Sequence, residues 1–144
     1  MAKQKQTVEF LSRVPLFKGL KKRQLESLAK RFVERDYQTG TAIVAQGKGG
    51  EGLFIVVAGH TDVIRVRSDG EKVQVNAFGP EDFFGELALL DDGPRTASVI
   101  TTEPTKCLVL TRWEFCGALR SDVEMAITIL EEMARRFRIA LDSL

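Results

Sequence analysis

The sequence predicts a mainly β fold with helices at both ends. Between Val33 and Thr111, glycines separate short apolar runs at fairly even spacing, which is typical of a compact β-sandwich or barrel-like roll. The segments before and after it instead carry apolar residues at helical spacing. A length of 144 residues suits one domain with its own core. We therefore expect a single domain over residues 1–144, with N-terminal helices in 1–32, the roll in 33–111 and C-terminal helices in 112–144.

Two helices are expected before the roll. In residues 7–14, apolar residues recur at helical spacing, and Pro15 should end that helix at or before Val14. A second apolar stripe predicts a helix over residues 25–32. The basic run Lys21–Arg23 is expected on the solvent-facing side of this helix. Such a run can be a contact patch, but it more often forms a solvated face.

Several short strands are expected within the roll. Leu53–Ala58 is nearly all apolar, so this strand should be buried on both faces. Two alternating runs flank Asp69-Gly70, which is a strong signal for a tight hairpin. The other strands are predicted from apolar alternation. The expected strands include residues 53–58, 63–67, 73–77, 96–101 and 106–111.

Two helices are expected to close the chain. Thr111 and Ser121 each begin a capping box, with Glu114 and Glu124 three positions later. An apolar stripe on the last helix should pack on the roll as a lid. Met125 and Ile129 lie off that stripe, so they could serve a dimer contact or pack on the roll. The stripe comprises Val123, Ala126, Ile127, Leu130, Met133, Ala134, Phe137 and Leu141.

Composition argues against several function classes. The net charge of +1 gives no strong electrostatic attraction to nucleic acid, and no apolar run is nearly long enough to span a membrane. Cys107 and Cys116 form no metal or disulfide pattern, and a single histidine, His60, cannot build a metal site or a catalytic triad. We therefore expect no enzyme activity, no metal, no cofactor and no direct binding to nucleic acid. A reducing, cytoplasmic setting fits this composition.

The stretch from Phe83 to Ser98 contains residue types that are suited to bind a small ligand. Gly85 lets the backbone approach a ligand closely, and the residues that follow favour a helical turn whose first amides can bind an anion. Arg95 adds a planar fork that matches phosphate oxygens. Glu86 is suited to accept a hydrogen bond from a hydroxyl group. This loop is therefore expected to hold a small, anionic and hydroxylated ligand, unless Glu86 and Arg95 merely form an ion pair that braces it.

These residues resemble the phosphate-binding cassette of the cyclic nucleotide-binding domain family, which is found in catabolite activator proteins, regulatory subunits of cAMP-dependent kinase and cyclic nucleotide-gated channels. The resemblance implies an eight-stranded antiparallel β-roll of jelly-roll type. It also implies that Glu86 holds the ribose 2′-OH and that Arg95 holds the cyclic phosphate. The matching residues are Phe84-Gly85-Glu86-Leu87-Ala88-Leu89 and Pro94-Arg95-Thr96-Ala97.

The resemblance also suggests how the base is bound. Val63 and Val75 are candidate walls, and the cap would come from Arg136, Phe137, Arg138 or Leu141 on the last helix. Ala140 and Leu141 stand where a catabolite activator protein uses hydroxyl residues, so base recognition departs from that pattern. The predicted ligand-binding residues are Phe84, Gly85, Glu86, Leu87, Ala88, Arg95, Thr96, Ala97, Val63, Val75 and Arg136.

Together these features predict a regulatory module that senses cyclic nucleotide and closes its C-terminal helix over the ligand. Thr96 can reach the guanine amino group in some family members, yet one such contact is worth only about 1 kcal/mol. We therefore expect cAMP as the main ligand, with measurable cGMP binding. Two alternatives are a fragment of a larger transcription factor, channel or kinase, and a degenerate domain that acts through protein contacts.

Overall fold

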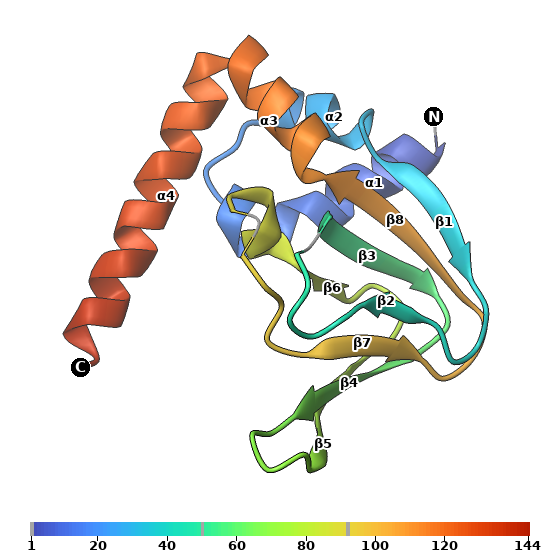
Figure 1. Cartoon of the computed structure of the whole chain (residues 1–144). Helices are drawn as coiled ribbons and strands as arrows, with labels where there is room; N and C mark the ends of the chain where they lie inside the picture. Colours follow the sequence, from blue (N-terminus) through green and yellow to red (C-terminus); the bar gives the residue numbers. More distant parts are fainter. Residues whose placement is uncertain (1, 50, 92) are drawn as a thin grey trace. The chain divides into compact units, whose positions relative to one another are not determined.

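The computed structural model describes residues 2–49, 51–91 and 93–144, which form two compact units (Figure 1). One unit is helical and contains residues 2–31 and 113–144; the other is the β unit of residues 32–112. The helices are α1 (Ala2–Ser12), the 3-10 helix η1 (Pro15–Phe17), α2 (Lys22–Ala29), the 3-10 helix η2 (Glu86–Leu89), α3 (Arg112–Ser121) and α4 (Val123–Asp142). The strands are β1 (Val33–Tyr37), β2 (Ala42–Val44), β3 (Gly52–Ala58), β4 (Thr61–Val66), β5 (Lys72–Phe78), β6 (Phe83–Phe84), β7 (Ser98–Thr101) and β8 (Thr105–Thr111).

The β unit consists of two four-stranded sheets. Their strand orders are β1-β8-β3-β6 and β2-β7-β4-β5, and every pairing between these strands is antiparallel. The sequence prediction of eight antiparallel strands flanked by helices is therefore confirmed. Both sheets contribute apolar side chains to one core. Its buried members are Val44, Phe54, Val56, Val63, Phe84, Val99, Cys107 and Val109.

Three aromatic rings stack within this core and support the start of the predicted cassette. The Phe84 ring lies 5.0 Å from that of Phe54 and 5.1 Å from that of Phe78, and both pairs are nearly parallel. Strand β3 is buried continuously from Gly52 to Val56, as its apolar run predicted, whereas its end at Val57 and Ala58 is more open. Strand β6 pairs with β3, so the cassette begins beside the continuously buried part of β3.

The hairpin predicted at Asp69-Gly70 joins β4 to β5. Strand β5 lies at the edge of its sheet and is mostly exposed, so its alternating pattern does not mark one buried face. The pairing register shifts after Val63, which pairs with Asn76, because Ile64 pairs with Gln74. Val75 is therefore the extra residue of a β-bulge, and it is exposed.

The helical unit has a core of its own. The rings of Phe17 in η1 and Phe115 in α3 lie 5.9 Å apart, and both side chains are buried. Arg31, just after α2, donates from Nη1 to the Glu114 carboxylate over 3.0 Å and so ties α2 to α3. Helix α1 begins at Ala2, earlier than the expected residue 7, and ends before Pro15 as predicted. Among the described residues, no helix is both long and apolar enough to cross a membrane.

Helix α4 buries a different face from the one that the sequence predicted. Its packed residues are Met125, Ile129 and Glu132, with Met125 fully buried, so these side chains are not available for a dimer contact. The reason is that α4 packs against η1 and the residues after it: the Thr128 methyl group comes within 2.8 Å of where a Cβ on Gly19 would lie.

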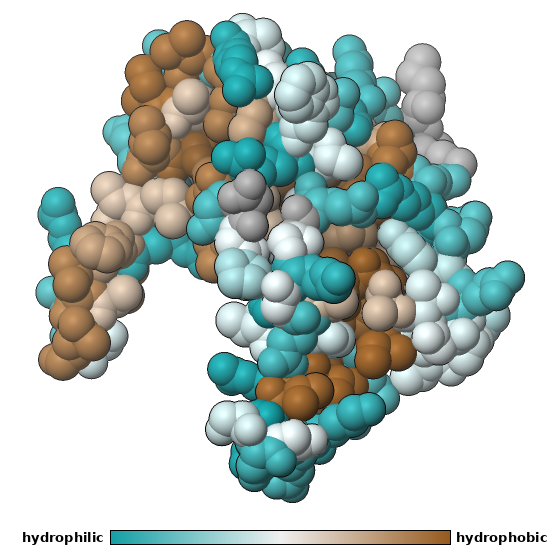
Figure 2. All heavy atoms as spheres, viewed as in Figure 1, coloured by the Kyte–Doolittle hydropathy of each residue, from teal (hydrophilic) through white to brown (hydrophobic). Residues whose placement is uncertain are grey.

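The apolar stripe that was expected to pack is instead largely exposed. Figure 2 shows apolar surface along this helix. The exposed members are Val123, Ile127, Leu130, Ala134, Phe137 and Leu141. The N-cap is also one residue later than expected, because Asp122 accepts the Met125 amide at 3.1 Å while Ser121 donates back to α3.

Candidate functional site

Gly85 connects β6 to η2 in a conformation that requires glycine. Its φ is +85°, a left-handed value that side chains disfavour. A Cβ here would lie 2.4 Å from the Gly52 carbonyl oxygen and 2.8 Å from Nη1 of Arg95. The backbone therefore fits closely against both β3 and the arginine. The sequence predicted a close approach of this backbone to a ligand, and that part stays a prediction.

Helix η2 follows at once and presents Glu86. Ala88 and Leu89 are buried and anchor the turn against β3, while Leu87 points outward with 57% of its surface exposed. Because the turn starts at Glu86, the amides of Glu86 and Leu87 have no acceptor within the helix. The half-buried Glu86 carboxylate thus lies beside amides that can donate to an anion.

Arg95 is fixed by backbone hydrogen bonds on both sides. Its amide donates to the Lys48 carbonyl and its carbonyl accepts the Gly47 amide, each over 2.8 Å. Gln46 extends this restraint, because its side chain exchanges two hydrogen bonds of 2.7 and 2.9 Å with the backbone of Val66 at the end of β4. The segment 46–48 therefore holds the backbone of Arg95 at a defined position next to the cassette.

The Arg95 guanidinium is partly buried and has capacity left for a ligand. Its Nη2 donates to the Gly52 carbonyl over 3.1 Å, while its buried Nε has no partner in the described part of the protein. Burial lowers the pKa of Arg95, and the nearby Glu51 carboxylate partly offsets this effect. The guanidinium remains charged because the ordinary pKa is so high. A partly buried cation with an unused, buried donor is a favourable site for an anion.

Glu51 is the residue near the site that the sequence reasoning missed. It forms an ion pair with Arg35 on β1 and also lies close enough to Arg95 to affect its pKa. Its backbone carbonyl accepts the Arg112 amide over 2.7 Å. The Glu51 carboxylate therefore places a negative charge of the protein itself near the Arg95 guanidinium. The acidic residue before a buried strand was the signal available in the sequence, but nothing there linked it to Arg95.

Two pockets adjoin along this loop. The first has a volume of about 470 Å³ and is lined by Gly85, Glu86, Leu87, Ala88, Asp91, Gly93, Pro94, Arg95 and Thr96. The second, of about 480 Å³, is lined by Gln46, Arg65, Val66, Arg67, Ser68, Val75 and Thr96. Thr96 lines both. The predicted Glu86, Arg95 and Thr96 thus share one pocket, and Val75 lies in its neighbour.

Other predicted residues lie behind or away from these pockets. Phe84 and Val63 are buried in the core, and Ala97 packs against it, so these three support the site from beneath. Arg136 lies on α4 in the helical unit, and its role as a cap stays a prediction. Asp92, within the predicted cassette 83–98, lies outside the described residues.

The described residues contain no group of three His, Cys, Asp or Glu side chains that could hold a metal ion. Cys107 is buried in the β core, and burial raises the pKa of its thiol to about 11. This thiol is therefore protonated at neutral pH, when it is a weak nucleophile and a poor metal ligand. The chemistry of the described site is that of binding through charge and hydrogen bonds.

Comparison with known proteins identifies related sequences and structures. Residues 34–122 match the model of the cyclic nucleotide-binding domain. A "CRP-like cAMP-activated global transcriptional regulator" of Mycobacterium tuberculosis is 30% identical over 130 residues, which cover 90% of this chain and 58% of that protein. The chain thus spans little more than half the length of this curated relative.

Two solved structures are also similar. The N-terminal domain of a transcriptional regulator from Streptomyces coelicolor A3(2) is 31% identical, with a TM-score of 0.84 and 94% of each chain covered. The catabolite activator protein of Thermus thermophilus is 33% identical, with a TM-score of 0.68 over 88% of this chain and 59% of that one.

Proposed function

The chain belongs to the cyclic nucleotide-binding domain family, and we propose that it is a regulatory sensor that binds cAMP in the pocket between Gly85 and Thr96. One observation carries the proposal: Glu86 and Arg95, predicted from the sequence to bind ribose and phosphate, line the same pocket. The unused Nε of Arg95 supports the assignment, because a buried cation gains most from an anionic partner.

In the proposed complex, Arg95 and the first amides of η2 take the cyclic phosphate. Glu86 accepts a hydrogen bond from the ribose 2′-OH at the other side of the same pocket. The base extends past Thr96 into the second pocket, where Val75 supplies an apolar contact. Val63 and Phe84 support this arrangement through the core beneath it.

The choice of cAMP rests on two arguments. The related M. tuberculosis regulator is described as cAMP-activated. Thr96 could add one hydroxyl contact to guanine, but such a contact contributes only about 1 kcal/mol, or roughly a fivefold change in affinity. We therefore propose cAMP as the preferred ligand, with weaker but measurable cGMP binding.

We further propose that α4 closes over the bound nucleotide. A ligand can drive closure only if it binds the closed state more tightly than the open one. The exposed apolar stripe of α4 supports this step, because closure would remove it from water. Arg136 on the same helix is the proposed cap for the base. The single-domain organisation over residues 1–144, the location in the cytoplasm and the lack of direct binding to nucleic acid stay predictions.

The main alternative is that the chain is the sensor part of a longer regulator, such as a transcription factor, channel or kinase. The 58% coverage of the M. tuberculosis protein favours this reading, because that relative has a large additional segment. A degenerate domain that acts only through protein contacts is less favoured, because Glu86 and Arg95 share the pocket.

Calorimetric titration of nucleotide-free protein with cAMP and with cGMP tests the proposal. Arg95→Ala should weaken cAMP binding by about 30-fold or more, since losing one partner of a buried charge pair costs about 2–5 kcal/mol. Arg120→Ala, an exposed arginine on α3, is the matched control and should bind like wild type. Absence of binding to either nucleotide, or equal affinity of the Arg95 variant and wild type, would refute the proposal.

A further inference from the structure

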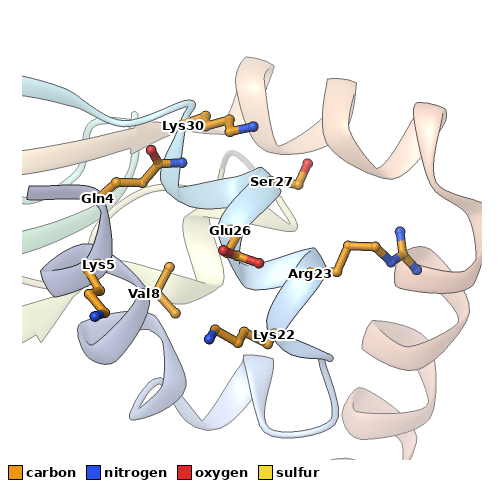
Figure 3. Close-up of a pocket in the computed structure, with 8 residues that line it drawn as sticks. All are labelled: Gln4, Lys5, Val8, Lys22, Arg23, Glu26, Ser27 and Lys30. Atoms are coloured by element: carbon orange, nitrogen blue, oxygen red, sulfur yellow. The ribbon is translucent and has the colours of Figure 1, made fainter. Parts of the chain in front are cut away.

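Helices α1 and α2 enclose a groove within the helical unit that the proposed nucleotide site does not use (Figure 3). Its volume is about 760 Å³, larger than either pocket at the cassette. Figure 3 shows Lys5 and Val8 of α1 facing Lys22 and Glu26 of α2, with Lys30 at one end. All of these residues belong to one compact unit, so the groove is a feature of that unit alone.

The groove concentrates positive charge. Four cations line it, Lys5, Lys22, Arg23 and Lys30, against the single carboxylate of Glu26, although the whole chain has a net charge of only +1. Among the described residues, no ion pair involves Lys5, Lys22 or Lys30, whereas Arg23 lies 3.8 Å from Asp122 at the start of α4. Three lysines around the groove therefore keep their charge available to a partner.

Part of the groove floor is apolar. Val8 is half-buried, and Figure 3 shows it between Lys5 and Lys22 with Glu26 beside it. A groove with an apolar floor and basic edges fits a segment that carries an apolar side chain between carboxylates. A nucleic-acid backbone fits less well, because it would bring phosphates next to Glu26 and leave Val8 without an apolar partner.

We propose that this groove, defined by Lys5, Val8, Lys22 and Lys30, binds an acidic segment of a partner protein. The eight residues of α2 span about 12 Å, which matches roughly four extended residues or two helical turns. An apolar side chain of the segment packs on Val8. Its flanking carboxylates pair with Lys30 at one end and with Lys5 and Lys22 at the other. In this proposal Lys22, from the basic run Lys21–Arg23, contributes to a contact surface.

The probe for the test is a fluorescein-labelled Glu-Glu-Leu-Glu-Glu peptide, titrated with the full chain at low salt and followed by fluorescence anisotropy. The groove variant combines Lys22→Glu with Lys30→Glu. The control variant combines Lys18→Glu with Lys72→Glu, which changes the net charge equally at exposed positions outside the groove. We expect saturable binding by wild type and by the control, about tenfold weaker binding by the groove variant, and weaker binding as salt is raised.

Several outcomes would overturn the proposal. The first is that wild type shows no saturable binding at about 1 mM peptide. The second is that peptide binding weakens equally in the two double variants. The third is that a DNA duplex or anionic lipid vesicles bind in preference to the peptide and depend on the groove residues. Far-UV circular dichroism and cAMP titration of both variants show that each is folded. Since the groove variant leaves Glu86 and Arg95 untouched, a failed peptide titration leaves the proposed nucleotide function standing, and a failed cAMP titration leaves the groove standing.

Discussion

Replacing Gly85 by alanine tests whether the close packing at the cassette holds Arg95 in its binding position. The substitution adds one methyl group at a residue whose φ is +85°. In the native backbone this methyl carbon would lie 2.4 Å from the Gly52 carbonyl oxygen and 2.8 Å from Nη1 of Arg95. Both distances are well inside van der Waals contact, so either the loop or the guanidinium must move.

The structure allows the cost to be worked out in two parts. A left-handed conformation costs alanine about 1–2 kcal/mol relative to glycine. Relief of the two overlaps adds about 1–3 kcal/mol, the usual cost of inserting a methyl group into a packed site. The expected loss in the free energy of unfolding is therefore about 2–5 kcal/mol. A domain of ordinary stability remains folded after such a loss, so binding can still be measured.

Gly70→Ala is the matched control. Gly70 has a φ of +87°, nearly the same as Gly85, but a Cβ on Gly70 would meet nothing within 4 Å. Urea unfolding should therefore show only the backbone cost for Gly70→Ala, about 1–2 kcal/mol, and the larger loss for Gly85→Ala. Calorimetry should show normal cAMP affinity for the control and at least tenfold weaker binding for Gly85→Ala, because Arg95 is displaced from Gly52.

The reasoning fails if the two variants lose equal stability, since the overlap at Gly85 would then carry no cost. It also fails if Gly85→Ala binds cAMP as tightly as the Gly70 control. In that case, the exact placement of Arg95 against the Gly85 backbone is not needed for the phosphate.

Three further predictions follow from the structure. Thr96→Ala should weaken cGMP binding about fivefold and leave cAMP binding unchanged, and an equal change for both nucleotides would contradict the proposed contact. Burial raises the pKa of Cys107 to about 11, so the buried thiol stabilises the fold below pH 9, and this contribution, on the order of 3 kcal/mol, is lost as the pH rises from 9 to 11. Urea unfolding of Cys107→Val should show a smaller alkaline loss than wild type. Sedimentation equilibrium should detect self-association through the exposed stripe of α4, which Leu130→Lys should abolish and Arg120→Lys should not; a mass independent of concentration would contradict it.

Local sequence signals predicted the β-roll well. The absence of a Cβ at Gly85 was read as room for a ligand, and the structure shows that Gly85 also has a left-handed φ and close neighbours in Gly52 and Arg95. Asp69-Gly70 marked the hairpin between β4 and β5 because a tight turn needs those residue types. These signals work because the cause lies within a few residues of the signal.

Long-range contacts could not be predicted in the same way. Glu51 is remote from Arg95 in the sequence, and only the fold brings its charge near the guanidinium. Gln46 gave no signal in the sequence of a link to β4, yet its side chain joins the loop to Val66 on that strand. Polar residues such as these carry no periodic pattern, so their partners follow from topology rather than from local propensity.

Helix α4 shows a further limit, because two of its faces are apolar. The sequence pattern indicated the wrong face, because the structure buries Met125 and Ile129 while it exposes Leu130 and Phe137. The exposed stripe recurs at alternating steps of three and four residues, which is also the spacing of a two-helix seam. A closing lid and a second copy of the chain would therefore compete for this one surface. Hydrogen exchange of α4 separates them, because a lid slows exchange only when cAMP is bound, whereas self-association slows it as protein concentration rises without ligand.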